Sequence, residues 1–354
     1  MTEILKLTGY LAERERYRGR FLTDAMLELF ARREVATSIV LRGIASFGPR
    51  NVARTDELLS MSEDLPAVVV AADTAERIAG LAEEVAAIIG RGLLTVERAR
   101  LIDQSGLPDP HDDEAVRMTL FLGRRQRVGG APAHVAATAV LHRLGFAGAI
   151  GCLGVDGTVG GRRRRAGFLS RNVEVPMLLL AVGTRRQARA AAAELRDLLG
   201  EVFLTVERLQ ICKHNSVLHA RPHPLPATDA AGLPLFQKVT VFTDEDARHD
   251  GQPIHRALVA RLRESHAAGA TAVRGVWGFT APDAPHGDRM SRLSRRVPVA
   301  TVLIDTPAGI AASFGIVDEL TAEHGLVTSE LVPAALSIDG AHRHGGIRLA
   351  RHDC

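Results

Sequence analysis

The residues best suited to chemistry lie in two charged segments of the sequence. Ser62, Glu63 and Asp64 are consecutive, and a glycine-bounded stretch holds the four arginines Arg162, Arg163, Arg164 and Arg165. An enzyme needs an acid or base beside a cleft, and clustered guanidinium groups can hold an anionic ligand, an acidic partner or lipid headgroups. The alternatives are that the acids only cap the end of a loop and that the arginines form a solvated loop tip.

Two further arginines lie beside glycines. Arg42 directly precedes Gly43, and Arg91 lies between Gly90 and Gly92. An arginine beside a permissive glycine can hold a phosphate or carboxylate group, and a surface ion pair is the alternative for Arg42. The sequence contains neither G-x-x-x-x-G-K-[ST] nor a strand-linked G-x-G-x-x-G. No set of nucleophile, base and acid can be assembled from the remaining residues.

The histidines are too scattered to define a metal site or a shared catalytic group. Three of them lie near Cys354 with a spacing that matches no structural zinc pattern, and four others have no counterparts in the first third of the chain. These are His342, His344 and His352, and His134, His142, His255 and His266. We therefore expect no metal, and the cofactor stays unknown.

The composition is that of a folded protein without a strong electrostatic preference. Of 354 residues, 46% are hydrophobic and 24% charged, and a net charge of +3 gives no global attraction to nucleic acid or anionic membranes. No apolar run approaches the ~20 residues of a membrane helix, and the N-terminus has no signal-peptide pattern. Three cysteines far apart fit a reducing cytoplasm better than a disulfide framework.

Constant spacings divide the chain into three diverged copies of one unit. The strand-like segments Lys6–Leu11, Arg117–Leu122 and Lys238–Thr243 each hold a base, an apolar residue, a threonine and, two positions later, an aromatic residue. Their threonines are 111 (119 − 8) and 121 (240 − 119) residues apart, and two sets of glycines keep these spacings. The other anchors are Gly19, Gly130 and Gly251; Gly43, Gly154 and Gly275; Pro66, Pro176 and Pro298; and Thr95–Arg98 and Thr205–Arg208, with Thr328–Glu330 in the third copy.

Each unit is predicted to have βαββαβ order. Strands with β-branched or apolar character and helices with a period of 3.6 residues alternate in the first copy. The strands are expected at Leu5–Leu11, Ser38–Leu41, Pro66–Ala72 and from Leu93, and the helices at Phe21–Arg33 and Ala75–Ile89. This is the ferredoxin-like order, in which two helices cover one face of a sheet. Three bare faces on one chain can cover one another, so we expect a monomeric, fused pseudo-trimer.

The same anchors predict the domain boundaries. The repeats are expected at residues 1–102, 116–212 and 235–336. Two linkers, 103–115 and 213–234, separate them, and the second linker contains four prolines. The tail 337–354 is rich in glycine and arginine without periodicity, which predicts disorder.

Three motifs of the first copy resemble a known family. Gly43–Gly48, Leu59–Pro66 and Gly92–Thr95 are similar to the family called domain of unknown function 190, which resembles the PII signalling proteins, homotrimers of ferredoxin-like subunits. The resemblance covers almost all of copy one and is traceable in the other two. It implies a PII-like trimeric core fused into one chain. Some members of the family are associated with fluoride-export membrane proteins, which implies a protein partner such as a membrane transporter.

The resemblance also implies ligand clefts between repeats, walled by the long loop after the second strand and by the loop before the fourth. Loops of this length are usually functional or mobile. In the first copy the candidate ligand residues are Arg42, Gly43, Phe47, Gly48, Ser62, Glu63, Asp64, Arg91, Gly92 and Thr95. The acids are partly lost in the other copies, so we expect one ligand-competent cleft. The longer basic loop that holds nucleotide phosphates in PII proteins is missing, so nucleotide binding does not follow.

The prediction that results is a non-enzymatic regulatory or binding protein. It would sense a small anionic ligand between repeats and present its long loops to a protein partner. The alternatives are an enzyme that uses Glu63 and Asp64, and a structural adaptor.

Overall fold

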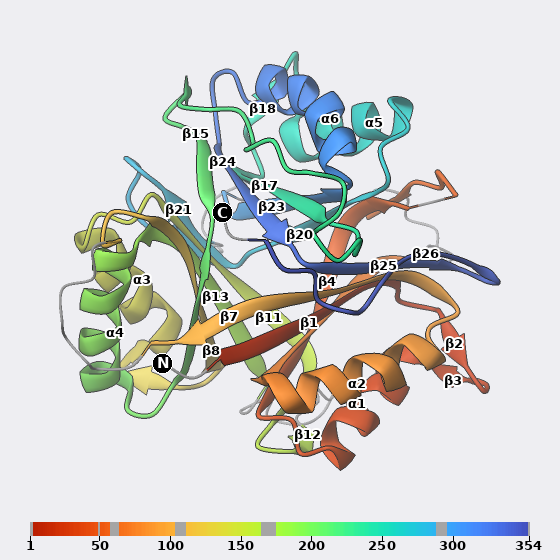
Figure 1. The fold of residues 1–354 in the computed structure, drawn as a ribbon. Helices are drawn as coiled ribbons and strands as arrows, with labels where there is room; N and C mark the ends of the chain where they lie inside the picture. The colour runs from red at the N-terminus through yellow and green to blue at the C-terminus, as the bar shows by residue number, and fades with distance from the viewer. Residues whose placement is uncertain are drawn as a thin grey trace.

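The computed structural model describes residues 3–48, 50–56, 64–102, 111–163, 175–287 and 296–352. In this part of the chain, three pairs of helices lie at the periphery and the strands run through the middle (Figure 1). The pairs are α1 (Leu22–Arg32) with α2 (Ala75–Ile88), α3 (Ala133–Arg143) with α4 (Arg185–Leu199), and α5 (Ile254–Glu264) with α6 (Pro307–Leu320). The chain is therefore three tandem α/β repeats around a shared centre of β-structure.

The first repeat has the element order strand, helix, strand, strand, helix, strand. Its principal strands are β1 (Glu3–Ala12), β4 (Thr37–Phe47), β6 (Pro66–Thr74) and β7 (Arg91–Leu101). β1 pairs antiparallel with both β6 and β7, and β4 pairs with the other edge of β6. The sheet order is therefore β7-β1-β6-β4, with the first strand in an inner position. Short strands β2 (Arg16–Tyr17) and β3 (Arg20–Phe21) form a hairpin ahead of α1, and β5 (Arg54–Thr55) pairs with β4.

The other two repeats reproduce this pairing. Their strands are β8 (Ala115–Gly123), β11 (Gly148–Val159), β13 (Pro176–Thr184) and β14 (Phe203–Arg208), then β17 (Phe236–Asp244), β20 (Ala270–Arg274), β21 (Trp277–Thr280), β23 (Pro298–Asp305) and β24 (Leu326–Val332). The sheet orders are β14-β8-β13-β11 and β24-β17-β23-β20. Hairpins β9 (Arg127–Val128) with β10 (Ala131–Pro132) and β18 (Arg248–His249) with β19 (Gln252–Pro253) precede α3 and α5.

Long strands join each repeat to the next. The first half of β4 pairs with β6 and β11, and its second half pairs with β20. β11 pairs with β13 and β21 before it reaches β4. Since β14 also pairs with β7, the strands close a ring in the order β1-β6-β4-β11-β13-β8-β14-β7. The repeats are thus one continuous body and not beads on a string.

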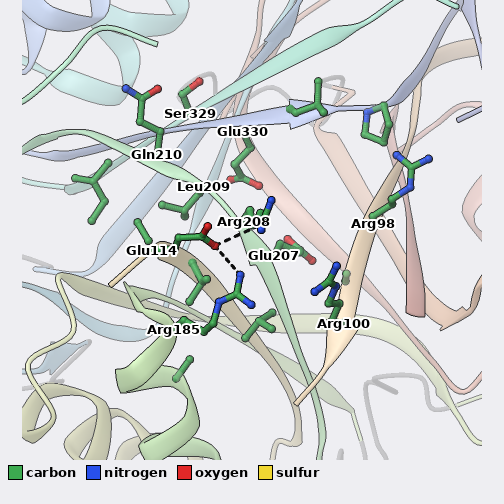
Figure 2. Close-up of a pocket in the computed structure, with 18 of the residues that line it drawn as sticks. Arg98, Arg100, Glu114, Arg185, Glu207, Arg208, Leu209, Gln210, Ser329 and Glu330 are labelled. Atoms are coloured by element: carbon green, nitrogen blue, oxygen red, sulfur yellow. Dashed lines mark hydrogen bonds and ion pairs between the residues drawn. The ribbon is translucent and has the colours of Figure 1, made fainter. Parts of the chain in front are cut away.

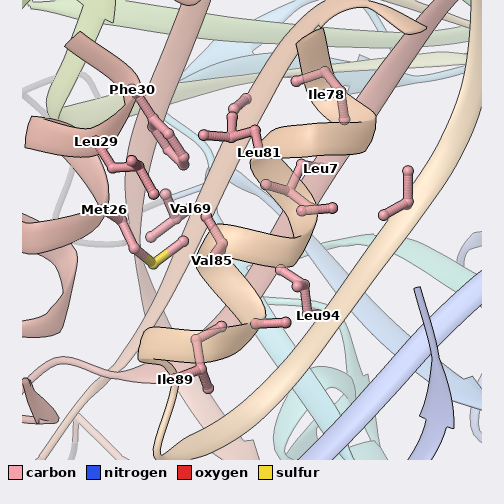
Figure 3. Close-up of a cluster of buried hydrophobic side chains, with 14 of the residues drawn as sticks. Leu7, Met26, Leu29, Phe30, Val69, Ile78, Leu81, Val85, Ile89 and Leu94 are labelled. Carbon is pink, nitrogen blue, oxygen red and sulfur yellow. The ribbon is translucent and has the colours of Figure 1, made fainter. Parts of the chain in front are cut away.

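Each helix pair covers the outer face of its own sheet with an aliphatic core. In the first repeat, α1 buries one stripe and α2 another at helical spacing, and both stripes pack on β1, β6 and β7 (Figure 3). This core includes Leu7, Met26, Leu29, Phe30, Val69, Ile78, Leu81, Val85 and Leu94. The opposite sheet faces meet in a second core that draws on all three repeats, with Ile39, Phe121, Ile150, Phe242 and Val273 among its members.

Glycine recurs at equivalent positions of the three repeats for two physical reasons. Gly19, Gly130 and Gly251 have φ values of +81°, +83° and +78° in the hairpins before the first helices, a conformation that favours glycine. Gly43, Gly154 and Gly275 instead lie where strands of different repeats cross. A Cβ on Gly154 would approach Ile39 of the first repeat to 2.7 Å, and one on Gly275 would approach Ile150 of the second repeat to 2.6 Å.

The expectation of a disordered tail is wrong for its described residues. β25 (Ala334–Asp339) pairs with β7, and β26 (His342–Gly346) folds back on β25. Ala350 is fully buried, and its carbonyl oxygen accepts a hydrogen bond from Arg98. The sequence of the tail has no hydrophobic periodicity, because its short strands are stabilised by pairing with a distant repeat and not by a local pattern. The prediction from periodicity was therefore wrong. Residues 353 and 354 lie outside the described chain.

The second linker is also more structured than its composition suggests. It overlaps β15 (Gln210–His214), which pairs with β24, and contains β16 (Val217–Leu218). Lys213 is buried, and its ammonium group lies 2.6 Å from an Asp318 carboxylate oxygen. The segment is thus an edge of the third sheet for part of its length. Of the first linker, only 111–115 are described, and Ala115 begins β8.

Candidate functional site

A cleft of about 330 Å³ lies between the first and third repeats. One wall is formed by the end of β4, the start of β7 and the end of β1. The other is formed by β20, the end of β23 and the hairpin of β25 and β26, which bring residues 268–271, 302–306 and 337–344 to the cleft. Residues more than two hundred positions apart in the sequence therefore share one site.

The lining combines apolar surface with a basic rim. Phe47, Leu93, Phe236 and Ile304 supply aromatic and aliphatic surface. Three arginines of the first repeat, Arg50, Arg54 and Arg91, also line the cleft, together with His344. Such a lining suits a small molecule with an anionic group and an apolar body.

One carboxylate already lies between two of these arginines. The Nε atom of Arg50 donates to Asp339 Oδ2 at 2.8 Å, and Nε of Arg91 donates to Asp339 Oδ1 at 3.1 Å. The hydrogen bond from Arg50 lowers the pKa of Asp339, and the same bond raises the pKa of Arg50. The rim therefore has the geometry to hold a carboxylate, and the third repeat's strand extension supplies one.

The structure brings four of the candidate ligand residues into this cleft: Phe47, Gly48, Arg91 and Gly92. Asp64 lies close by, because one of its carboxylate oxygens is 3.7 Å from Nε of Arg54. Its other oxygen accepts a 2.7 Å hydrogen bond from the backbone N–H of Arg14. Ser62 and Glu63 lie outside the described residues.

The other three candidates lie elsewhere. Arg42 is half exposed and pairs with Glu13 at 2.5 Å, which is the surface ion pair that the sequence left open. Gly43 lies at the crossing of β4 and β20. Thr95 is fully buried near the centre of the molecule, where its hydroxyl donates to Glu97 at 3.1 Å.

The arginine run of the second repeat is described only in part. Arg162 and Arg163 form β12, which folds back on β11. Arg162 is exposed, whereas Arg163 hydrogen bonds to Asp156 at 2.7 Å and to Asp24 of the first repeat. Although burial opposes it, these bonds raise the pKa of Arg163. Arg163 therefore joins two repeats, and Arg164 and Arg165 lie outside the described residues.

A second charged assembly is buried where side chains of all three repeats meet, and the sequence did not predict it. The repeated bases Lys6, Arg117 and Lys238 lie directly across from the repeated acids Glu97, Glu207 and Glu330 on neighbouring strands. All six are at most 7% exposed. We call this set the charge ring. The recurrence of a base in the first strand and a glutamate in the last was visible in the sequence, but their pairing required the strand register.

Each base in the charge ring contacts the glutamate of its own repeat and that of another. Nζ of Lys6 donates to Glu207 at 2.7 Å and lies 3.9 Å from Glu97. Arg117 contacts Glu207 and donates to Glu330 at 2.6 Å. Lys238 contacts Glu97 and lies 3.1 Å from Glu330. Three positive and three negative charges therefore alternate around the ring.

The electrostatics of the ring keep two of its carboxylates, Glu97 and Glu207, ionised. Burial opposes ionisation of Glu97, but the charges of Lys238, Lys6 and Arg117 hold its pKa well below the ordinary range. The pKa of Glu207 is lowered in the same way by Arg117 and Lys6. Burial, aided by Arg117, lowers the pKa of Lys6.

The three ring carboxylates could also be considered as metal ligands, since their oxygens lie within 4.8 Å of one another. Each of these carboxylates already forms ion pairs with at least two of the bases Lys6, Arg117 and Lys238. The cation that three carboxylates require is thus built into the protein. The ring therefore acts as an internal clamp between repeats.

The fold and the site define a tandem-repeat α/β protein whose strands pair between repeats, with a cleft at a repeat boundary. The family model for domain of unknown function 190, described as "Uncharacterized ACR", matches residues 4–101, 115–211 and 236–334. The chain belongs to this family and carries three copies of its domain. It is also similar to the UPF0166 protein of Aquifex aeolicus (strain VF5), with 29% identity over 91 residues that make up 25% of this chain and 84% of that relative. Among the described residues, no helix is long and apolar enough to cross a membrane.

Proposed function

We propose that this chain is a PII-like binding or regulatory protein in which three ferredoxin-like units form a fused pseudo-trimer. Two observations support the architecture. Every repeat has its first strand inside the sheet order fourth, first, third, second, and the UPF0166 relative is about as long as a single repeat. Such a relative would need separate chains to build what this protein builds with one.

The observation that carries the ligand proposal is that two repeats converge on one cleft. The first repeat supplies Arg50, Arg54 and four of the candidate residues, and the third repeat supplies an apolar wall. The four candidates are Phe47, Gly48, Arg91 and Gly92. Arginines at the rim select an anionic group, and the apolar surface takes up the rest of the molecule. The ligand would therefore be a small organic anion of about the cleft's volume. Its carboxylate or phosphate would replace Asp339 between Arg50 and Arg91.

The proposed regulatory output is a contact with a protein partner, for which a membrane transporter is the candidate that the family resemblance implies. The segments 48–65, 159–175 and 287–297 each lie between the second and third strands of a repeat in the sequence. β4, which delivers Phe47 and Gly48 to the cleft, runs directly into the first of them. A ligand in the cleft would thus lie at the base of the partner-binding loop. Buried Cys152 and Cys212 are free thiols, which fits the proposed cytoplasmic location.

Binding should be tested by isothermal titration and thermal shift with a panel of small anions, including citrate, inorganic phosphate and AMP. We expect at least one to raise the melting temperature of the wild type, because a ligand that binds only the folded state stabilises it. Arg91→Gln should abolish that shift. The matched control is Arg42→Gln, which changes an exposed arginine of β4 that lies outside the cleft.

Two results would contradict the proposal. One is that no organic anion in the panel binds. The other is that Arg42→Gln and Arg91→Gln weaken binding equally, since the effect would then be one of overall charge. Turnover of a metabolite that Asp64→Asn abolishes would instead favour the enzymatic alternative.

A further inference from the structure

A second and larger cavity, about 1320 Å³, lies at the opposite end of the same strands. The first cleft meets the end of β1 and the start of β7, whereas this cavity meets Glu3 at the start of β1 and residues 98–102 at the end of β7. It also takes in the start of β8, the first turns of α4 and the ends of β14 and β24. Glu207 and Glu330 of the charge ring form part of its wall. We call this space the axial cavity.

Arginines dominate the charged lining of the axial cavity. They come from β7, from the start of α4 and from the end of β14, and Figure 2 shows four of them around the same space. They are Arg98, Arg100, Arg185, Arg189 and Arg208. Guanidinium groups from three separate elements can contact several oxygens of one polyanion, which a single surface arginine cannot do.

Among the described residues, the acids that pair with these arginines are Glu3 and Glu114 of the lining and Asp112 beside it, which pairs with Arg189. Glu114 lies between Arg185 at 2.6 Å and Arg208 at 3.3 Å, so one acid serves two guanidinium groups (Figure 2). Glu3 is mostly exposed and lies 3.7 Å from Arg98. Glu207 and Glu330 add no net charge, because the three bases of the charge ring neutralise them. Among the described residues, Arg100 forms no ion pair.

The remaining lining is suited to an organic body. Aliphatic side chains such as Val116, Leu209 and Leu331 alternate with groups that can donate or accept hydrogen bonds, such as Gln210 and His223. The space is also several times larger than one phosphate or carboxylate group needs. Size, an arginine-rich lining and mixed walls therefore favour one class of occupant.

We propose that the axial cavity is a second ligand site, separate from the cleft between repeats one and three, and that it binds an organic molecule carrying two or more phosphate groups. The phosphates would contact Arg98 and Arg100 on one side and Arg208 on the other, above the neutral floor of the charge ring. Because the cavity is formed by β7, β14 and β24 of all three repeats, its occupant would contact every repeat.

The test uses the full chain and sodium tripolyphosphate as the probe, measured by isothermal titration at constant ionic strength. We expect saturable binding with one site per chain, and much weaker binding of inorganic phosphate. The double variant Arg100→Gln/Arg208→Gln should weaken tripolyphosphate binding roughly tenfold or more, since each charged hydrogen bond contributes more than a neutral one. Both side chains are exposed, and circular dichroism with the melting temperature of the free protein verifies that the variant folds.

Arg42→Gln, which changes an exposed arginine outside both cavities, is the matched control and should bind tripolyphosphate like the wild type. The proposal is overturned if tripolyphosphate does not bind, or if the double variant binds it as well as the wild type does. It is also overturned if Arg91→Gln weakens binding as much as the double variant does, because the probe would then occupy the cleft. Failure of this proposal leaves the small-anion proposal for the cleft untouched, as that proposal depends on Arg91 and not on Arg100.

Discussion

Removal of one carboxylate from the charge ring should strongly destabilise the protein. Glu97→Gln keeps the shape of the side chain but leaves three buried bases with two acids. Lys238 loses its hydrogen-bonded partner, and Arg117 and Lys6 lose a negative charge at 3.5 and 3.9 Å. A buried charge without compensation is costly because no water solvates it.

The expected loss in the free energy of unfolding is about 3–5 kcal/mol, the usual cost of breaking a buried ion pair from one side. The double variant Glu97→Gln/Lys238→Met should recover part of this loss. It leaves Lys6 and Arg117 with Glu207 and Glu330, a balanced set in which the 2.7 and 2.6 Å contacts persist. The two substitutions should therefore be non-additive.

The assay is equilibrium urea denaturation at pH 7 on the four proteins of this mutant cycle. Glu28→Gln is the control, because Glu28 pairs with Arg20 on the exposed face of α1 and its loss should change little. A loss below about 1 kcal/mol for Glu97→Gln would refute the reasoning, since a buried base without its partner cannot cost so little. Strict additivity of the two substitutions would refute it as well.

The stabilising contribution of Glu97 should also depend on pH. The folded-state pKa of Glu97 is depressed, so its contribution to stability is present above its unfolded-state pKa of about 4.3. That contribution is lost as the pH falls toward the folded-state pKa. Glu97→Gln should accordingly lie closest to the wild type in acid and furthest from it at neutral pH.

Three further results are expected. Asp339→Asn should raise the affinity of the cleft for a small anion, because Arg50 and Arg91 lose their internal carboxylate; titration showing equal or weaker binding would contradict this. Burial, aided by Arg274, lowers the pKa of His255 to about 4. As the pH falls, the unfolded state therefore takes up this proton before the folded state does, and the free energy of unfolding should fall by about 3 kcal/mol between pH 6.5 and pH 4. In urea denaturation, His255→Gln should remove that part of the pH dependence. Gly154→Ala should cost about 1–3 kcal/mol, since its Cβ would meet the Pro176 carbonyl oxygen at 2.6 Å, whereas Gly80→Ala on α2, which has open space around it, should be neutral or stabilising in the same assay.

The three copies and the family resemblance could be read from the sequence because both depend on local chemistry. Gly19, Gly130 and Gly251 recur because each hairpin needs a positive φ. The helices of the first repeat were located within one residue, since each has a buried stripe at helical spacing. Phe47 and Gly48, at the end of β4, and Arg91 and Gly92, at the start of β7, were chosen from the loops that the family resemblance indicated, and the structure places all four in one cleft.

The tail and the charge ring depend on contacts between repeats that the sequence does not predict. β25 forms because β7 of another repeat offers it an edge, 238 residues earlier in the register Ala334↔Val96. Asp339 reaches Arg50 and Arg91 only as a consequence of that pairing. The role of Arg163, which contacts Asp24 on α1, likewise depends on how two repeats meet.

The sequence by itself determined the repeating backbone, the elements of each unit and the residue types available at each end of the strands. Only the tertiary structure decided which of these residues meet. Strand pairing between repeats aligns the three bases with the three glutamates of the charge ring, and it gathers arginines into two separate cavities at opposite ends of the sheets. The physical reason is that hydrogen-bond register and charge compensation act across distances in sequence that no local pattern records.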